Sequence, residues 1–466
     1  MARVVIIGGG PAGYEAALVA AQLDAEVTVV EADGAGGACV LSDCVPSKTL
    51  IASCEALTAF RHGSRLGVRV GDPAAVSLDV ATVHARVKRL ALAQSADIAG
   101  KLEAAGVELI RGRARLGSPA PGHHHPVVIE PADGAPYEVR ATHVLIATGA
   151  TPRILPGCEP DGERILNWRQ VYDLDELPER LIVVGSGVTG AEFASAYLAA
   201  GAEVTLVSSR ERVMPHEDPD AANVIERVFR ARGMNVLSKS RAATATRTAD
   251  GVVVTLTDGR TVEGSHVLMA VGSVPNTANL GLAEYGVALS PSGHVTVDRV
   301  SRTNIPGIYA AGDCTGVLPL ASVAAMQGRI AMWHALGEAV SPLWLQTVSA
   351  TVFTDPELAT VGVSQSDVDS GRVAGRSVML PLAGNARAKM GDITDGFVKL
   401  FCRSGSGTVI GGVVVAPRAS ELILPIALAV ENHLSVGQLA HTITIYPSLS
   451  GSITEAARQL MHREYD

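Results

Sequence analysis

Two glycine-rich stretches, 177 residues apart, constrain the fold of this chain more than any other feature. Each follows a short apolar run and opens a helical run: RVVIIGGGPAG near the start of the chain and LIVVGSGVTG from residue 181. The glycines in GxGxxG register are Gly8, Gly10 and Gly13 in the first stretch and Gly185, Gly187 and Gly190 in the second. Such glycines let a pyrophosphate approach a helix N-terminus. The sequence therefore predicts an α/β fold with two bound dinucleotides.

Each glycine motif belongs to a strand–turn–helix–strand unit, and the residue that ends this unit distinguishes the two sites. Eighteen residues after the last glycine, the first unit has Glu31, where a carboxylate accepts bonds from an adenosine ribose. The second unit has Ser208 at the same distance, followed by Arg210 and Arg212. Hydroxyls and guanidiniums favour a 2′-phosphate that a carboxylate would repel. We therefore expect the second site to accept NADPH; surface arginines on a loop are the alternative interpretation.

Length and composition limit the class of protein. A chain of 466 residues exceeds one compact core, so about two to four domains are expected. The formal net charge of −9 argues against nucleic-acid binding. There is no apolar run of about 18 residues that would form a transmembrane segment, and MARVVIIGGG leads directly into a strand, unlike a signal peptide. Six cysteines do not form a secreted disulfide framework, which favours a cytoplasmic protein.

The segment GGACVLSDCVPSK contains a closely spaced cysteine pair, Cys39 and Cys44, with Lys48 just behind it. Two cysteines with four residues between them in a cysteine-poor chain can form a small disulfide ring that opens and closes reversibly. A flavin is the natural electron source for such a ring. The region 51–110 is expected to be mainly helical. Residues 112–142 contain the turn signals GSPAPG and PADGAP and are expected to be irregular.

Three adjacent histidines, His123, His124 and His125, lie within that turn-rich region. Adjacent histidines cannot easily converge on one metal ion, so a solvated hairpin tip is the preferred interpretation, and no metal site is predicted. Further along, the apolar strands end at Thr148-Gly149, near Gly272, and at Asp313, which precedes a helical run that includes Ala321. From about residue 345 the pattern changes to strands of an antiparallel sheet, which indicates a third domain.

The order of motifs GGGPAG, CxxxxCxPSK, ATGA, GSGVTGAE, GDC and VFTDPELATVG resembles that of the flavoprotein disulfide reductases, the lipoamide dehydrogenase and glutathione reductase family. The resemblance covers essentially the whole chain. It implies two Rossmann-like domains, for FAD and NAD(P), and a C-terminal α+β interface domain that builds a homodimer. The expected boundaries are 1–152 and 276–345 for the FAD domain, 153–275 for the NAD(P) domain and 346–466 for the interface domain.

The resemblance also assigns residues to sites. It implies FAD contacts at Gly8, Gly10, Gly13, Glu31, Lys48, Thr148, Gly149, Asp313 and Ala321. It implies NAD(P) contacts at Gly185, Gly187, Gly190, Glu192 and Gly272, to which the sequence adds Ser208, Arg210 and Arg212. By the same resemblance Lys48 would lie near flavin N5, paired with Glu192, so that positive charge steadies the reduced flavin.

One departure from the family occurs near the C-terminus. The family motif is close to HxHPTxxE, in which the partner subunit contributes a His held by a Glu. The aligned stretch here is TIYPSLSG, with Thr444 at the first His position, Tyr446 at the catalytic one and Gly451 at the Glu. Tyrosine, with an ordinary pKa of about 10, does not replace the lost general base at neutral pH. Losing positioned acid–base catalysis costs about 10²–10⁴ in rate. His441 and His462 are close in sequence, without any sign that either reaches the cysteine pair.

Three functions are therefore weighed. Reduced flavin could pass electrons to a quinone, which needs no thiol relay; this is the preferred hypothesis, and it fits a resemblance to mycobacterial NAD(P)H quinone reductases of this family. Dithiol–disulfide reduction, as in lipoamide dehydrogenase, is favoured by Cys39 and Cys44 but opposed by Tyr446 and Gly451. A catalytically silent, flavin-bearing scaffold is opposed by the intact second fingerprint, Lys48 and Glu192. On the preferred hypothesis the cysteine segment mainly seats the flavin ring.

Overall fold

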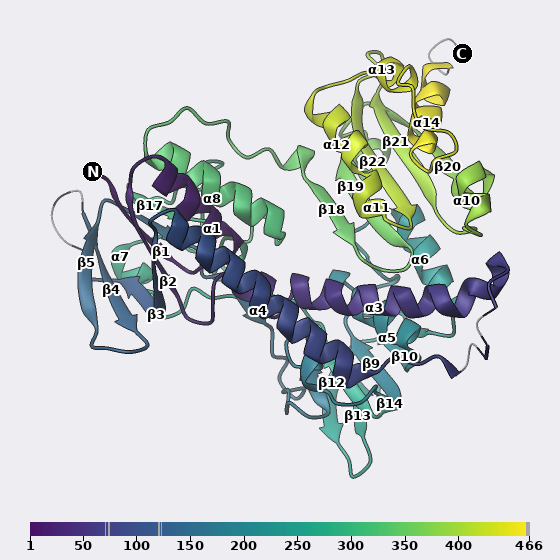
Figure 1. Ribbon diagram of the computed structural model, residues 1–466, viewed down its shortest axis with the longest axis horizontal. Coiled ribbons are helices and arrows are strands. Elements are labelled where there is room, and N and C mark those ends of the chain that lie inside the picture. Colours follow the sequence, from purple (N-terminus) through teal and green to yellow (C-terminus); the bar gives the residue numbers. More distant parts are fainter. Residues whose placement is uncertain (70, 73–74, 120–121, 123, 463–466) are drawn as a thin grey trace. The chain divides into compact units, whose positions relative to one another are not determined.

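The computed structural model describes residues 1–462 except 70, 73–74, 120–121 and 123 (Figure 1). The chain divides into two compact units. Unit 1 comprises Met1–Thr49, His84–Arg153 and Gly272–Trp344, and unit 2 comprises Leu50–Val83, Ile154–Val271 and Leu345–Asp466. Two of the unit boundaries fall inside long helices, so part of each helix is assigned to each unit. These helices are α3 (Cys44–His62) and α4 (Val80–Ala104).

Unit 1 is built on a seven-stranded sheet in the order β17-β6-β1-β2-β3-β4-β5. Its strands are β1 (Arg3–Ile7), β2 (Glu26–Glu31), β3 (Glu108–Leu116), β4 (His125–Pro131), β5 (Tyr137–Ala141), β6 (His143–Ile146) and β17 (Ile308–Ala310). The first five strands in spatial order, β17 to β3, are parallel, whereas β4 is antiparallel to β3 and β5 is antiparallel to β4. The order reverses between β1 and β6, where open α/β sheets bind their ligands. A separate antiparallel pair joins β7 (Ala150–Pro152) to β16 (Ser273–Pro275).

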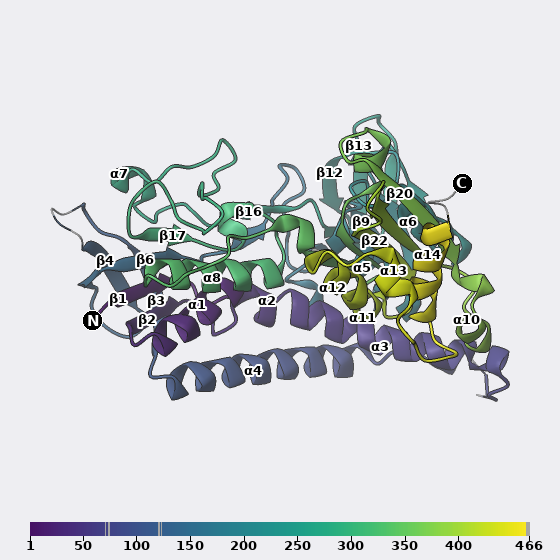
Figure 2. The ribbon, with the colours of Figure 1, turned by 90° about the horizontal axis from the view of Figure 1, so that it is seen from above.

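Two helices pack against each other beside this sheet: α1 (Pro11–Gln22) and α8 (Ala321–Ala335) (Figure 2). Their close approach depends on Gly328, because a Cβ there would lie 2.1 Å from the Ala12 carbonyl oxygen. The central strands of the sheet form the core, since β1 is an almost uninterrupted run of buried Val and Ile, as a parallel strand covered on both faces requires. Unit 1 also contains α2 (Gly37–Leu41) and α7 (Leu282–Tyr285).

The expectation that residues 112–142 are irregular is wrong. The segment continues β3 and forms β4 and β5, because Val127 and Ile129 alternate with more exposed residues and bury one face completely. The turn signals mark only the connections between these strands. Of the three histidines, His123 lies outside the described residues and His124 is exposed, as a hairpin tip requires. His125 instead begins β4 and its Nδ1 lies 2.8 Å from the Tyr285 hydroxyl, so it is not a tip residue.

Unit 2 contains a second parallel sheet, in the order β11-β10-β9-β15-β8. Its strands are β8 (Ile165–Asn167), β9 (Arg180–Val184), β10 (Glu203–Val207), β11 (Asn235–Leu237) and β15 (His266–Met269), with helices α5 (Val188–Ala200) and α6 (Pro219–Ala231). A three-stranded antiparallel sheet accompanies it, formed by β12 (Ala242–Arg247), β13 (Val252–Leu256) and β14 (Thr261–Gly264). The arrangement around β9 repeats that around β1, which explains why the two glycine stretches share one register.

The C-terminal part of unit 2 is a five-stranded antiparallel sheet in the order β18-β19-β22-β21-β20. Its strands are β18 (Ser349–Val352), β19 (Glu357–Gly362), β20 (Gly375–Pro381), β21 (Phe397–Arg403) and β22 (Val409–Ala416). The helices of this part are α9 (Gln365–Asp369), α10 (Ala386–Met390), α11 (Ala419–Leu422), α12 (Leu424–Glu431), α13 (Val436–Ala440) and α14 (Gly451–His462). Helices α12 and α14 pack against the sheet over one apolar cluster. The predicted fold class, two dinucleotide-binding units and an antiparallel C-terminal sheet, is confirmed. None of the helices in the described ranges is both long and apolar enough to cross a bilayer.

Candidate active site

The turn between β1 and α1 has the geometry of a pyrophosphate cradle. Gly8 adopts φ +108°, and a Cβ there would lie 2.3 Å from the Ala147 carbonyl oxygen. A Cβ on Gly13 would lie 1.9 Å from the Gly8 carbonyl oxygen, so neither position accepts a side chain. Gly10 is different: it is the N-cap of α1, and a Cβ there would meet nothing within 4 Å. The helix N-terminus therefore faces open space in which a phosphate fits.

Glu31 lies beside this turn at the end of β2. Its carboxylate accepts hydrogen bonds from the backbone N–H groups of Gly9 and Asp33, the latter at 2.8 Å. These bonds fix the carboxylate next to the glycines and leave its remaining lone pairs for an incoming hydroxyl. The position agrees with the predicted role in binding an adenosine ribose.

The neighbouring strand ends supply further candidate contacts. After β6, the Thr148 hydroxyl donates to the Asn276 carbonyl oxygen at 2.7 Å, and the Asn276 amide donates back to the Thr148 carbonyl oxygen at 2.9 Å. Gly149 follows with φ +66°, so the chain turns away sharply at the reversal of strand order. Gly272 stands directly before β16 with φ +87°, and its expected NAD(P) contact stays a prediction.

Asp313 follows β17 at the carboxyl edge of the same sheet. Burial raises the pKa of its carboxyl group, and the nearby His294 acts in the opposite direction. A carboxyl group at this strand end can exchange hydrogen bonds with the hydroxyl groups of a ligand. The preceding Gly312 donates its N–H to Gln327 on α8, and Ala321 is the first residue of that helix. The FAD positions inferred from the sequence thus lie at strand ends and helix starts of one sheet, and these residues fit a bound dinucleotide.

The cysteine segment folds back onto the first glycine turn. The Gly36 N–H donates to the Gly9 carbonyl oxygen at 2.8 Å, and a Cβ on Gly37 would lie 2.9 Å from the Gly10 Cα. Cys39 lies on the short helix α2, and Cys44 begins α3. The pair is therefore held against the phosphate cradle rather than on a free loop.

The two cysteines are free thiols joined by a hydrogen bond, with Lys48 close enough to act on both. The bond from Cys44 lowers the pKa of the Cys39 thiol, and burial and Asp43 oppose this effect. The pKa of Cys44 is raised by the same bond and by burial. A single deprotonation would therefore place the thiolate on Cys39.

Sequence reasoning missed two residues beside this pair. Asp43 precedes Cys44, and its negative charge raises the pKa of Cys44. Tyr14 lies on the first turn of α1; burial, then Glu15, and then the charge of Cys39 raise the pKa of its hydroxyl. Asp43 could have been found as the only acid inside the CxxxxC segment. Tyr14 could not, because only the folding of the cysteine segment onto the cradle brings it near Cys39.

The second glycine turn, between β9 and α5, repeats the first in detail. Gly185 adopts φ +112° and a Cβ there would lie 2.1 Å from the Ala270 carbonyl oxygen. A Cβ on Gly190 would lie 1.9 Å from the Gly185 carbonyl oxygen, whereas Gly187, the N-cap of α5, faces open space. This turn therefore offers a second phosphate cradle.

Ser208 has partners of its own within the protein, and its predicted contact with the NAD(P) ligand stays a prediction. It is fully buried, and its hydroxyl lies 2.7 Å from the Ser186 hydroxyl and also contacts the backbone of Arg210 and Arg212. Because Ser186 corresponds to Gly9, this pair occupies the place of the Gly9–Glu31 bond in unit 1. Ser208 thus shapes the loop, on which Arg210 is exposed and Arg212 half-buried. An open groove of about 480 Å³ adjoins Arg212 and is lined also by Glu211, Asn223, Glu226, Arg227 and Arg230.

Glu192 is buried in α5 with 3% of its surface exposed. Its carboxylate accepts a hydrogen bond from the Phe353 N–H at 2.9 Å, just after β18. Ser195, one turn later, accepts from the Asp355 N–H at 3.2 Å. Within unit 2, α5 therefore holds the VFTDPE segment through two side chains. The pairing of Glu192 with Lys48 stays a prediction.

Tyr446 lies on an exposed segment before α14, with 85% of its surface accessible. Two neighbours, Ile443 and Ile445, are 100% and 80% exposed. Gly451 is the first residue of α14, and a Cβ there would lie 3.5 Å from the Ser448 hydroxyl and 4.0 Å from that of Thr444. A side chain at 451 would therefore project toward the segment that carries Tyr446. Neither position carries the imidazole or the carboxylate of the family motif.

Two dinucleotide cradles, a thiol pair against the first and an antiparallel C-terminal sheet define a flavoprotein oxidoreductase of the pyridine-nucleotide type. The model of the pyridine nucleotide-disulphide oxidoreductase family matches residues 2–328, and that of its dimerisation domain matches residues 348–457. The chain belongs to this family, which implies FAD and NAD(P)H as its cofactors.

Individual relatives are similar over nearly the whole chain. An NAD(P)H dehydrogenase (quinone) of Mycobacterium tuberculosis is 61% identical and covers 100% of this chain and 95% of its own length. The crystal structure of LpdA from Mycobacterium tuberculosis has a TM-score of 0.95 at 60% identity, covering 99% of this chain and 100% of the other. A dihydrolipoyl dehydrogenase of Chlorobaculum tepidum is 34% identical, covering 97% and 96%. The expected resemblance to lipoamide dehydrogenases and to a mycobacterial quinone reductase is confirmed.

Proposed function

We propose that this protein is an FAD-dependent NAD(P)H:quinone oxidoreductase with poor or no activity on lipoamide and other disulfides. The observation that carries the proposal is the C-terminal motif: Tyr446 and Gly451 replace the His and Glu of the family, while both dinucleotide cradles keep their geometry. The mycobacterial relative that is 61% identical, an NAD(P)H dehydrogenase (quinone), supports the same function. Bound FAD would supply two-electron chemistry, taking a hydride from NAD(P)H and giving the electrons to an acceptor.

The chain's own residues have separate tasks in this proposal. The α1 and α5 N-termini hold the two pyrophosphates through free N–H groups, and Glu31 holds the adenosine ribose of FAD. Lys48 supplies positive charge beside the cysteine pair, where negative charge develops as electrons arrive. A quinone needs protons rather than a thiol base, so the loss of the His–Glu pair leaves these tasks intact.

The test is steady-state turnover of the purified holoenzyme with NADPH or NADH against a benzoquinone and against lipoamide. Rapid quinone reduction with little lipoamide reduction is expected. Rapid lipoamide reduction would favour the dithiol alternative, for which the hydrogen-bonded thiols of Cys39 and Cys44 are the supporting observation. If NAD(P)H is not oxidised with any acceptor, the result would support the alternative of a catalytically silent scaffold.

For the hydride donor we favour NADPH as an accepted substrate. No carboxylate occupies the end of β10, and Arg210 and Arg212 follow the buried Ser208 along the chain. The double variant Arg210→Ala/Arg212→Ala should raise the KM for NADPH by about tenfold, because a tenfold change corresponds to the loss of roughly one charge-assisted hydrogen bond to the 2′-phosphate. The KM for NADH should change little, and exposed Arg140 on β5 provides a matched Arg→Ala control.

We also propose a homodimer in the cytoplasm. The match to a dimerisation domain supports the homodimer. So do the exposed side chains of Ile443, Ile445 and Tyr446, since protein interfaces commonly cover apolar groups of this kind. Six cysteines in a chain of 466 residues do not make a secreted disulfide framework, which supports the cytoplasm. Sedimentation of the holoenzyme should give twice the mass of the chain, and Ile443→Asp/Ile445→Asp should shift it toward the monomer.

A further inference from the structure

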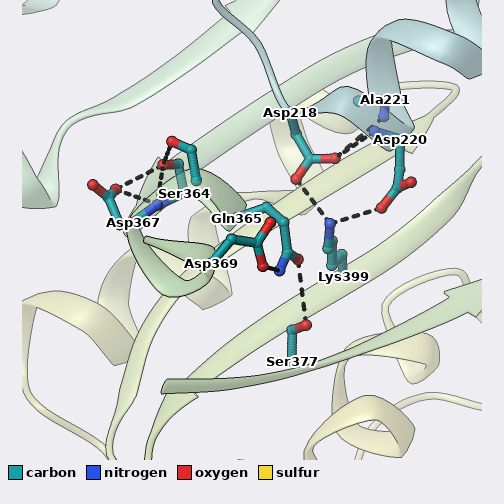
Figure 3. A network of polar contacts seen from close by, with 10 residues as sticks. Asp218, Asp220, Ala221, Ser364, Gln365, Asp367, Asp369, Ser377 and Lys399 are labelled. Atoms are coloured by element: carbon teal, nitrogen blue, oxygen red, sulfur yellow. Dashed lines mark hydrogen bonds and ion pairs between the residues drawn. The ribbon is translucent and has the colours of Figure 1, made fainter. Parts of the chain in front are cut away.

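A buried lysine of the C-terminal sheet is bound to the start of α6. Lys399 on β21 is 3% exposed, and its ammonium group donates to Asp218 Oδ2 at 2.9 Å and to Asp220 Oδ2 at 2.8 Å (Figure 3). The Asp218 side chain is 1% exposed and that of Asp220 is 49% exposed. The ring of Phe401 lies 5.4 Å from the same ammonium. A lysine is rarely buried without such partners, so this group is a fixed point of unit 2.

The other oxygen of Asp218 caps α6. Asp218 Oδ1 accepts from the Asp220 N–H at 3.0 Å and from the Ala221 N–H at 3.3 Å. One carboxylate thus joins the buried ammonium to the first turn of the helix. Asp218 is also the last residue of the segment 208–218, which follows β10. We call this segment the nucleotide loop.

The nucleotide loop is attached at its start, middle and end. At its start Ser208 bonds to Ser186 in the second glycine turn. In its middle the Met214 N–H donates to the Ser186 carbonyl oxygen at 2.8 Å, and the buried Val213 N–H donates to Glu226. Its end is the link from Asp218 to Lys399.

Arg210 and Arg212 lie between these attachments. Neither guanidinium forms an ion pair within the described parts of the chain, where the neighbouring Glu211 carboxylate is paired with Lys239. Their positions relative to the second glycine turn are therefore set by the attachments of the loop backbone. A phosphate is bound tightly only by guanidiniums held at a fixed place.

We infer that Lys399 is a positioning residue for the 2′-phosphate of NADPH: it fixes the end of the nucleotide loop and, through it, Arg210 and Arg212. The inference rests on the proposed NADPH binding. Without Lys399 the Asp218 carboxylate is buried with no cation and moves toward water, which displaces the start of α6 and the loop that precedes it.

The experiment is a titration of the holoenzyme with NADP⁺ and with NAD⁺, followed by calorimetry. Lys399→Met should weaken NADP⁺ binding by about tenfold and leave NAD⁺ binding nearly unchanged, because NAD⁺ lacks the 2′-phosphate. Lys399→Arg should retain most of the NADP⁺ affinity. Lys389→Met, on the exposed face of α10, is the matched control and should alter neither affinity.

Asp218→Asn breaks the same ion pair from the other side while keeping a capping oxygen, so it tests the inference even if Lys399→Met does not fold. It should also weaken NADP⁺ selectively, and the double variant Lys399→Met/Asp218→Asn should recover affinity because no charge is left unpaired. Equal weakening of both nucleotides, or no change, would overturn the inference. If the unaltered protein does not bind NADP⁺, the proposed use of NADPH fails, and the inference about Lys399 fails with it. The proposed quinone reduction is tested separately, because NADH can serve as the donor in that assay.

Discussion

Cys39 and Cys44 share one hydrogen bond but have opposite acid–base behaviour. The bond from Cys44 lowers the pKa of Cys39, so its thiolate forms at a lower pH than that of an ordinary cysteine. Removing the donor with Cys44→Ala should raise the pKa of Cys39 and move its reaction with iodoacetamide to higher pH. The rate of Cys39 alkylation in the reduced holoenzyme, followed by peptide mass spectrometry across a pH series, measures the shift.

Cys54 provides the internal control for that measurement. Burial raises the pKa of its thiol to about 12, and the side chain is 2% exposed, so it should stay unmodified throughout. A midpoint for Cys39 that does not move in Cys44→Ala would contradict the assigned hydrogen bond.

Glu192 combines a structural bond with a proposed electrostatic role, and the two can be separated by substitution. Glu192→Gln keeps a side-chain oxygen for the Phe353 N–H but removes the negative charge. It should leave the thermal stability nearly unchanged and slow NAD(P)H oxidation, if the charge acts on hydride transfer as proposed. Glu192→Ala should in addition cost about 1–3 kcal/mol of unfolding free energy, since a buried N–H loses its acceptor. Thermal unfolding and pre-steady-state reduction of the holoenzyme distinguish the two effects.

At the scale of the element, the glycines of one turn perform different tasks. Gly8→Ala places a Cβ against the Ala147 carbonyl oxygen at positive φ, so it should destabilise the fold by roughly 1–3 kcal/mol. Gly10→Ala places a Cβ in open space, so the fold should persist while bound FAD is lost. Flavin absorbance and thermal unfolding of the two variants check this, with Gly100→Ala in α4 as a control that has no close neighbour. Equal flavin loss in all three would contradict the cradle.

The same comparison explains what the sequence could and could not predict. The glycine turns were predictable because the three glycines of each GxGxxG register lie within one short stretch of the chain. The sequence suggested a ligand role for Ser208, yet its hydroxyl is used by Ser186, and only the folded sheet brings the two together. Lys399 gave no signal at all, since its partner Asp218 is 181 residues away. The strands β4 and β5 were missed because turn signals outweighed a short alternation of Val127 and Ile129.

At the scale of the whole molecule, the two units carry separate halves of the proposed chemistry. Unit 1 holds the first cradle and the cysteine pair, and unit 2 holds the second cradle and the segment with Tyr446. The family motif requires the partner subunit to supply a base from the aligned segment. The replacements in that segment are therefore expected to affect disulfide reduction, which in this family needs residues of both subunits. The two dinucleotide cradles are unaffected by these replacements.

This reasoning gives a test by restoration. A Glu at position 451 would project toward the segment that carries residue 446, because the Gly451 Cβ direction meets the Ser448 and Thr444 hydroxyls. The double variant Tyr446→His/Gly451→Glu should therefore raise lipoamide reduction by at least about tenfold, part of the 10²–10⁴ that a positioned base contributes. Quinone reduction should change little, and Tyr446→His alone should gain less because its imidazole lacks an orienting carboxylate. In the further variant that carries Cys39→Ser, the gain should vanish. A gain that survives the loss of Cys39 would show that the restored activity bypasses the thiol pair and that the missing base is not what silences disulfide chemistry.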